Sequence, residues 1–253
     1  MSEPSVEERS LPFGQAAAEY DTYHPSYPRV AAEWLLEGAT RTVVDIADVG
    51  AGTGVFTNVL VDFGLNVTAF EPDSGMIDQF AHRLSSVTRG QTRAENLRVP
   101  DGSFDALTVA QAFHWFDAPV AAREFERVVR PGGFFGLLWN QRDDRVAWIA
   151  AMRRIAAGGD VRRGNANEAT DEVASFFPSV ERAEFAHLVP MTPQAIVGLV
   201  APFSFVRLSP DRDQRLEAMR EPLATPRPQG PRSHRRAVPN CRLPGKATST
   251  GNI

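Results

Sequence analysis

Short apolar runs alternate along this chain with longer stretches in which apolar residues recur every three or four positions. Runs of four to eight apolar, often β-branched residues are typical of buried strands, and a spacing of three or four is typical of amphipathic helices. The pattern predicts strands over residues 42–49, 66–71, 104–110 and 134–139, and helices over 29–38, 55–63, 74–84, 120–129 and 148–157. Strands that alternate with helices form a parallel sheet with right-handed crossovers. We therefore expect an α/β, doubly wound, mostly parallel sheet of the seven-stranded, Rossmann-like type.

The alternation of apolar runs with helical spacing becomes less regular in the second half of the chain. It predicts a weak strand over 88–94, a sixth strand over 180–189, and helices over 193–200 and 211–221. Residues 226–253 contain five prolines and few apolar positions, too few to offset the entropy lost on ordering. We expect that tail to be disordered or aberrant and the final edge strand of the sheet to be missing. The predicted organisation is a disordered segment (1–10), a lid with a helix (11–40), the main domain (41–225) and the tail (226–253).

Composition is that of a soluble globular protein, with 43% hydrophobic and 23% charged residues. There is no apolar stretch of about 18 residues, and the acidic, polar first residues do not resemble a secretory signal. The single cysteine, Cys241, excludes an intramolecular disulfide, and no Cys/His cluster has zinc spacing. These features predict a cytoplasmic protein without a metal or a membrane partner, either a monomer or a weak dimer.

Charge is distributed unevenly along the chain. The net charge is −4, but five arginines and Lys246 lie after residue 225 without any acidic residue, which leaves the first 225 residues at about −10. An acidic body argues against a nucleic-acid partner, because neutralising phosphates supplies most of that affinity.

The most informative motif is a glycine-rich turn, Asp-Val-Gly-Ala-Gly-Thr-Gly, at residues 48–54. It follows the first predicted strand and opens the next helix. Glycines at such a turn let the backbone approach a ligand, and the amides of the helix N-terminus point toward it. The second predicted strand ends in Glu71, where nucleotide-binding α/β domains place a carboxylate on the ribose hydroxyls. The two features together predict a cofactor that contains a nucleoside.

Glycine spacing separates two kinds of nucleoside cofactor. A dinucleotide fingerprint needs Gly-x-Gly-x-x-Gly, whereas this turn has Gly50, Gly52 and Gly54, and Val55 stands where the third glycine would belong. The spacing therefore argues against a nicotinamide-dependent dehydrogenase.

The turn resembles the first motif of class I S-adenosylmethionine-dependent methyltransferases, and Glu71 matches the acidic residue at the end of their second strand. Segments 94–105, 111–116 and 124–133 strengthen the resemblance, which covers about residues 12–220. Together they are similar to the small-molecule branch that includes trans-aconitate and cantharidin methyltransferases.

The resemblance implies roles for individual residues. The three glycines would lie against the methionyl part of S-adenosylmethionine, with Asp48 near its ammonium group. Glu71 would accept from the ribose hydroxyls, and Gln111 would face the sulfonium. Ala94 and Glu95 would lie where the adenine amine is read. The implied cofactor-binding set is Asp48, Gly50, Ala51, Gly52, Thr53, Gly54, Glu71, Pro72, Ala94, Glu95 and Gln111. The alternatives are that Asp48 satisfies amides of its own turn, that Glu71 is a solvated strand end and that Glu95 is a solvated loop residue.

Candidate residues for the acceptor side are fewer. His114, beside two aromatic residues after the fourth strand, is the best candidate for a general base, and the alternative is that it lines the cofactor pocket. Asn140 and Arg142 are candidate acceptor contacts, although Arg142 could equally be solvated. The aromatic residues Phe13, Tyr20, Tyr23 and Tyr27 would form a lid. Relatives usually carry an arginine where this chain has His24, which argues against recognition of an anion there.

These observations predict an enzyme that transfers a methyl group from S-adenosylmethionine to oxygen or a carboxylate of a small-molecule acceptor. The alternative is a cofactor-binding protein of the same fold with little or no turnover. Methylation of nucleic-acid amino groups is disfavoured, because Gln-Ala-Phe-His at 111–114 replaces the Asn/Asp-Pro-Pro-aromatic motif of those enzymes.

Overall fold

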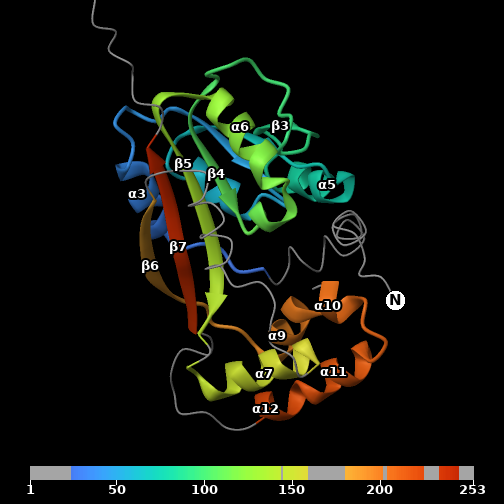
Figure 1. Cartoon of the computed structure of the whole chain (residues 1–253). Helices are drawn as coiled ribbons and strands as arrows, with labels where there is room; N and C mark the ends of the chain where they lie inside the picture. Colours follow the sequence, from blue (N-terminus) through green and yellow to red (C-terminus); the bar gives the residue numbers. More distant parts are fainter. Residues whose placement is uncertain (1–23, 144, 159–179, 202–203, 225–233, 245–253) are drawn as a thin grey trace, which may run out of the picture.

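A seven-stranded sheet in the order β3-β2-β1-β4-β5-β7-β6 organises the molecule (Figure 1). The structure, a computed structural model, describes residues 24–143, 145–158, 180–201, 204–224 and 234–244. Neighbouring strands from β1 to β5 are parallel, whereas β7 runs antiparallel to both β5 and β6. The prediction of a doubly wound, mostly parallel α/β fold is confirmed. The strands are β1 (Asp45–Val49), β2 (Asn66–Phe70), β3 (Thr88–Gly90), β4 (Phe104–Ala110), β5 (Val129–Arg142), β6 (Glu181–Leu188) and β7 (His234–Pro244).

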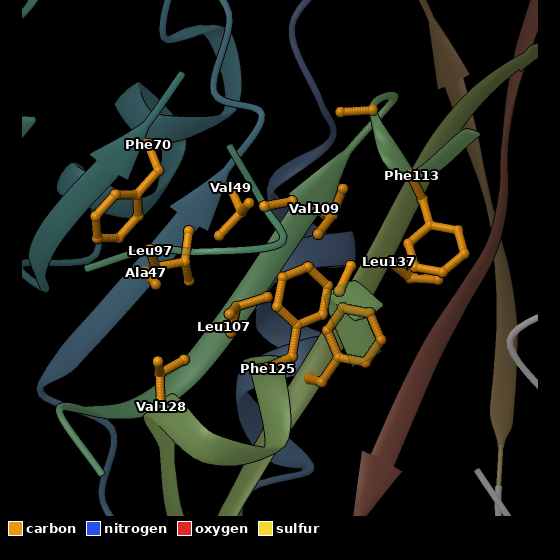
Figure 2. Close-up of a cluster of buried hydrophobic side chains, with 14 of the residues drawn as sticks. Ala47, Val49, Phe70, Leu97, Leu107, Val109, Phe113, Phe125, Val128 and Leu137 are labelled. Atoms are coloured by element: carbon orange, nitrogen blue, oxygen red, sulfur yellow. The ribbon is translucent and has the colours of Figure 1, made fainter. Parts of the chain in front are cut away.

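Helices cover both faces of the parallel part of the sheet. Alternate residues of a strand face opposite sides of the sheet. Ile46 of β1 packs with α3 (Arg29–Glu37) and α4 (Val55–Val61) on one side. Ala47 and Val49 pack with α6 (Ala118–Val128) on the other. Figure 2 shows the α6 side, where Phe125 and Val128 meet residues of β1 and β4. A further helix, α5 (Ser74–Arg83), buries Phe80 against Ala69 of β2. The sheet is therefore the central layer of three.

Five more helices form a separate group near the end of β5 (Figure 1). This helical group has its own apolar cluster, which includes Met152, Val206 and Met219. The helices are α7 (Ala147–Ala157), α9 (Pro193–Val200), α10 (Ser204–Arg207), α11 (Arg212–Ala218) and α12 (Arg220–Ala224).

One buried carboxylate links the amino ends of β1 and β4. Asp105 accepts hydrogen bonds from the amides of Val44 and Asp45, each at 3.0 Å, and from Arg130 at 2.9 Å. Arg41 adds an ion pair at 3.0 Å. Burial alone would raise the pKa of Asp105, but these hydrogen bonds hold it below its usual value. The carboxylate is therefore ionised and structural.

The expectation of a disordered tail and a missing strand is wrong for residues 234–244. They form β7, which pairs along its length with both neighbours and lies inside the sheet rather than at its edge. Both pairings skip a residue at Pro239: Leu137 pairs with Cys241 but Trp139 with Val238, and a similar shift occurs against β6. A bulge leaves the proline, which has no N–H, outside the ladder. The remaining tail residues lie outside the described ones.

Strand β5 also differs from its prediction. It begins at Val129 and passes through Arg-Pro-Gly-Gly at 130–133, the segment between the predicted helix (120–129) and the predicted strand (134–139). The register against β4 jumps there, from Phe104–Val129 to Ala106–Phe134, so the segment is a bulge. A side chain at Gly133 would place its Cβ 2.2 Å from the Asp105 carbonyl oxygen. Close strand contact therefore requires glycine.

The predicted lid is only partly described. Residues 1–23, with Phe13, Tyr20 and Tyr23, lie outside the described part of the chain. Tyr27 is a core residue: it is buried and packs edge-on against Phe56, with ring centroids 5.0 Å apart. Strand β3 is shorter than predicted and ends at Gly90.

Candidate functional site

The candidate site lies where β1, β2 and β4 end. The amides of Gly50 and Ala51 donate to the carbonyl oxygen of Phe70, at 2.8 and 3.1 Å. The glycine turn is therefore fastened to the end of β2, directly beside Glu71. Carboxyl ends of adjacent parallel strands share one edge of the sheet, which is where ligands bind in open α/β folds.

Glu71 closes the contact between β2 and the glycine turn. Its Oε2 accepts a hydrogen bond from the Gly52 amide at 2.9 Å, and its Oε1 accepts one from the Asp73 amide at 2.9 Å. Burial raises the pKa of Glu71 to about 7, against the lowering effect of those two hydrogen bonds. Each carboxylate oxygen accepts more than one hydrogen bond. Glu71 can therefore hold the turn and still accept from a ligand diol.

A side chain would meet different surroundings at each of the three glycines of the turn. All have positive φ, but a Cβ at Gly50 would lie 2.4 Å from the Cβ of Ala112, and one at Gly54 would lie 2.8 Å from Phe80. Both glycines are thus required by packing. At Gly52, no described residue beyond its chain neighbours has an atom within 4 Å of the Cβ position. Gly52 is therefore the glycine of the turn whose Cβ position is not limited by packing.

Asp48 lies beneath the turn, fully buried. Its Oδ2 accepts from the Thr57 hydroxyl at 2.5 Å and its Oδ1 from the Thr108 hydroxyl at 3.2 Å. Burial raises the pKa of Asp48 to about 6, although the two hydroxyls lower it. The alternative that Asp48 satisfies turn amides finds no support in these contacts, and its role toward the cofactor ammonium stays a prediction. Sequence reasoning missed both threonines, because a threonine on a helix or strand carries no motif.

Gln111 occupies a strained position at the end of β4. Its φ is +59°, which is uncommon for a residue other than glycine and is concentrated at functional sites. The side chain donates from Nε2 to the carbonyl oxygen of Asn140 at 3.0 Å. Asn140 in turn donates from its side chain toward the Ser26 carbonyl oxygen at 3.4 Å. Gln111 and Asn140 therefore link the ends of β4 and β5 on the edge that carries the turn.

The loop that carries Ala94 and Glu95 is held by α6. Glu95 accepts a hydrogen bond from the Asp117 amide at 2.8 Å. This contact within the protein argues against the alternative that Glu95 is a solvated loop residue. Glu124 accepts from the Leu97 amide at 2.7 Å and forms an ion pair with Arg127 at 2.7 Å. Ala94 is buried in the α6-side core. Recognition of adenine by this loop stays a prediction.

The other predicted residues take the following places. His114 is exposed on a short 3₁₀ turn (Phe113–Trp115), its ring centroid 4.7 Å from that of Trp115. Pro72 is exposed and Ala51 half-buried, while Thr53 is buried with no hydrogen-bond partner for its hydroxyl within the described part of the chain. His114 follows β4 on the edge of the sheet that carries the turn.

A carboxylate and a glycine turn meet at the candidate cofactor site. The Gly52 amide donates to Glu71 at 2.9 Å, and the space around the Gly52 Cβ position is open. Among the described residues, no group of three or more His, Cys, Asp or Glu is placed to hold a metal ion. Nor does any helix of that part of the chain have the length and apolarity needed to cross a membrane.

Comparison with known proteins places this geometry in context. A family model described as a methyltransferase domain matches residues 47–137. An uncharacterized methyltransferase of Mycobacterium tuberculosis is 39% identical over 223 residues, which cover 87% of this chain and 89% of that protein. Malonyl-(acyl-carrier protein) O-methyltransferase of Serratia marcescens is 30% identical over 122 residues, 48% of each chain.

A solved structure shows the same architecture. A protein from Anaeromyxobacter dehalogenans assigned as a type II methyltransferase superposes with a TM-score of 0.63 and 26% identity, covering 88% of this chain and 98% of its own. The similarity to these proteins therefore extends well beyond the glycine turn.

Proposed function

Because the chain belongs to the methyltransferase family, we propose that it transfers a methyl group from S-adenosylmethionine to a small-molecule acceptor. The observation that carries the choice of cofactor is Glu71, a buried carboxylate at the end of β2 that also accepts from the Gly52 amide. A buried carboxylate beside a half-buried glycine turn suits a ribose diol and a compact polar group. Val55 stands where a dinucleotide site would need its third glycine.

When bound, S-adenosylmethionine supplies an electrophilic methyl group on a positively charged sulfur. Glu71 would accept hydrogen bonds from the ribose hydroxyls, each worth about 1.5–3 kcal/mol when the acceptor is charged. The Gly52 backbone would lie against the methionyl part, and Gln111 would stand at the end of β4 on the same edge of the sheet. Methyl transfer is an in-line displacement. The protein can therefore accelerate it mainly by orienting the cofactor and the acceptor.

An oxygen atom of a small molecule is the acceptor that we favour. The Serratia marcescens relative is named as an O-methyltransferase, and a carboxylate or an acidic hydroxyl needs little or no help from a base. The acidic first 225 residues do not favour nucleic acid. The motifs suggestive of the trans-aconitate and cantharidin branch point in the same direction.

Two measurements test the proposal. Calorimetry should show binding of S-adenosylhomocysteine by the wild-type protein, strongly weakened in Glu71→Ala, with no binding of NAD. Radiolabelled S-adenosylmethionine incubated with a metabolite extract should then yield a labelled small molecule. Binding of NAD in place of S-adenosylhomocysteine would refute the cofactor, and label found only in nucleic acid would refute the acceptor class.

A further inference from the structure

Gln111 stands where the chain leaves β4 and begins the segment that packs on the glycine turn. That segment, residues 112–116, includes the 3₁₀ turn that carries His114. It touches the first glycine of the turn closely, because a Cβ at Gly50 would lie 2.4 Å from the Cβ of Ala112. The direction in which the chain leaves β4 therefore sets where the 112–116 segment lies on the glycine turn.

The backbone of Gln111 is in a conformation that glycine favours. Its φ is +59°, and among the described residues other than glycine it shares a positive φ with Arg98 alone, at +55° on an exposed loop. Such a conformation is costly for a residue with a side chain and persists where the surrounding structure holds it. Contacts beyond the local backbone must therefore hold Gln111 in place.

The side chain of Gln111 supplies such a contact by extending the ladder between β4 and β5. The two strands pair as far as Ala110 and Leu138, and the Gln111 amide donates to the Leu138 carbonyl oxygen at 2.9 Å. The next carbonyl oxygen of β5 on that side belongs to Asn140, and it accepts from Nε2 of Gln111 at 3.0 Å. A carbonyl oxygen can only accept, so the nitrogen end of the side-chain amide must face it. Asn140 is itself paired with Ala237 of β7, so this tether is anchored inside the sheet.

We propose that Gln111 is a positioning residue, whose tether to Asn140 holds the 112–116 segment on the glycine turn before the cofactor binds. Ordering that is complete in the free protein does not have to be supplied at binding, so the tether increases affinity. The identity of the cofactor rests on the proposed function, whereas the tether is a property of the protein alone. This role differs from direct contact of Gln111 with the sulfonium, because its effect is already present without a ligand.

Hydrogen–deuterium exchange of the full chain without cofactor tests the tether. The amides of Trp115 and Phe116 close the 3₁₀ turn with hydrogen bonds of 2.9 and 3.1 Å to carbonyl oxygens three residues earlier. Gln111→Gly removes the tether, while glycine adopts a positive φ without strain. Exchange of the 112–116 segment should become about tenfold faster, and S-adenosylhomocysteine should bind about tenfold more weakly in calorimetry, as expected for the loss of one hydrogen bond. The midpoint of urea denaturation should change little, because relief of the strain offsets the lost bond.

Two further variants control for strain and for folding. Arg98→Gly relieves a positive φ in the same way on an exposed loop, and it should leave both the exchange of 112–116 and the binding of S-adenosylhomocysteine unchanged. Gln111→Glu keeps the shape of the side chain, but an ionised carboxylate has no proton to donate to the Asn140 carbonyl oxygen. It should show both effects, and it carries the test if circular dichroism shows that Gln111→Gly is misfolded.

The outcomes separate this proposal from its alternatives. Weaker binding with unchanged exchange would mean that Gln111 acts by direct contact, and faster exchange with unchanged binding would mean that the tether serves the fold alone; either result overturns the proposal. Equal effects in Arg98→Gly would overturn it as well. Failure of the wild type to bind S-adenosylhomocysteine would refute the proposed function, while faster exchange in the Gln111 variants would still support the tether.

Discussion

Glu71→Gln should remove much of the pH dependence of stability in the protein without cofactor. The substitution keeps the size of the side chain but removes its ionisation. Burial raises the pKa of Glu71 from 4.5 to about 7. The folded protein therefore retains a proton on this group that the unfolded chain releases between pH 4.5 and 7.

The sign and size of the effect follow from that difference. Stability falls with rising pH wherever the folded state binds more protons than the unfolded state. Each pKa unit corresponds to about 1.36 kcal/mol, so Glu71 alone should lower the free energy of unfolding by about 3 kcal/mol as the pH rises from 4.5 to 8. Below pH 4.5 the penalty is absent, and above pH 7 it is complete.

Urea denaturation of both proteins at several pH values between 4.5 and 8 measures the effect. Glutamine loses an acceptor for one of the two backbone amides, a cost of about 1–3 kcal/mol that does not depend on pH. The difference in unfolding free energy between wild type and variant should therefore shift by about 3 kcal/mol in favour of the variant across this range. Glu126→Gln, at an exposed position of α6, is the control and should give a constant difference. A constant difference for Glu71→Gln as well would refute the reasoning.

Four further substitutions separate binding, packing and catalysis. Gly52→Ala should cost only about 1–2 kcal/mol of stability, because its φ is positive, yet it should weaken the binding of S-adenosylhomocysteine measured by calorimetry. Gly50→Ala should lower the free energy of unfolding in urea by about 3 kcal/mol or more, because its Cβ would meet Ala112. Asp105→Ala should lower the free energy of unfolding by about 1–3 kcal/mol, because it leaves the partly buried amides and arginines around the carboxylate unpaired. His114→Ala should lower kcat toward a hydroxyl acceptor, but not toward a carboxylate acceptor, if His114 is the general base.

Each of these has an outcome that contradicts it. Full affinity for S-adenosylhomocysteine in Gly52→Ala would mean that this glycine does not face the cofactor. Wild-type stability of Asp105→Ala would mean that the amides and arginines around it find other partners. An unchanged rate of His114→Ala with a hydroxyl acceptor would eliminate the base.

The first five strands and the glycine turn could be predicted because local signals set them. Apolar runs between helical periods mark β1, β2 and β4, and Gly50, Gly52 and Gly54 mark the turn directly. The sequence alone could not show which of those glycines is required by packing. That distinction depends on Ala112 and Phe80, which come from elsewhere in the chain.

Strand β7 could not be predicted because its order comes from its neighbours. Residues 234–244 contain two prolines and several arginines and show no sustained alternation, so no local signal favours a strand. Backbone pairing with β5 on one side and β6 on the other supplies the missing stability.

The position of β7 has a consequence for the order in which the sheet is built during synthesis. β7 is the last of the described strands to leave the ribosome, yet it separates β5 from β6. Until residues 234–244 have emerged, β5 is an open edge and β6 has no strand on which to dock, so the nascent sheet presents unpaired backbone groups that invite association with other chains. Completion of this sheet is therefore a late event, and a nascent chain interrupted before residue 234 should aggregate although the whole glycine turn has already been made.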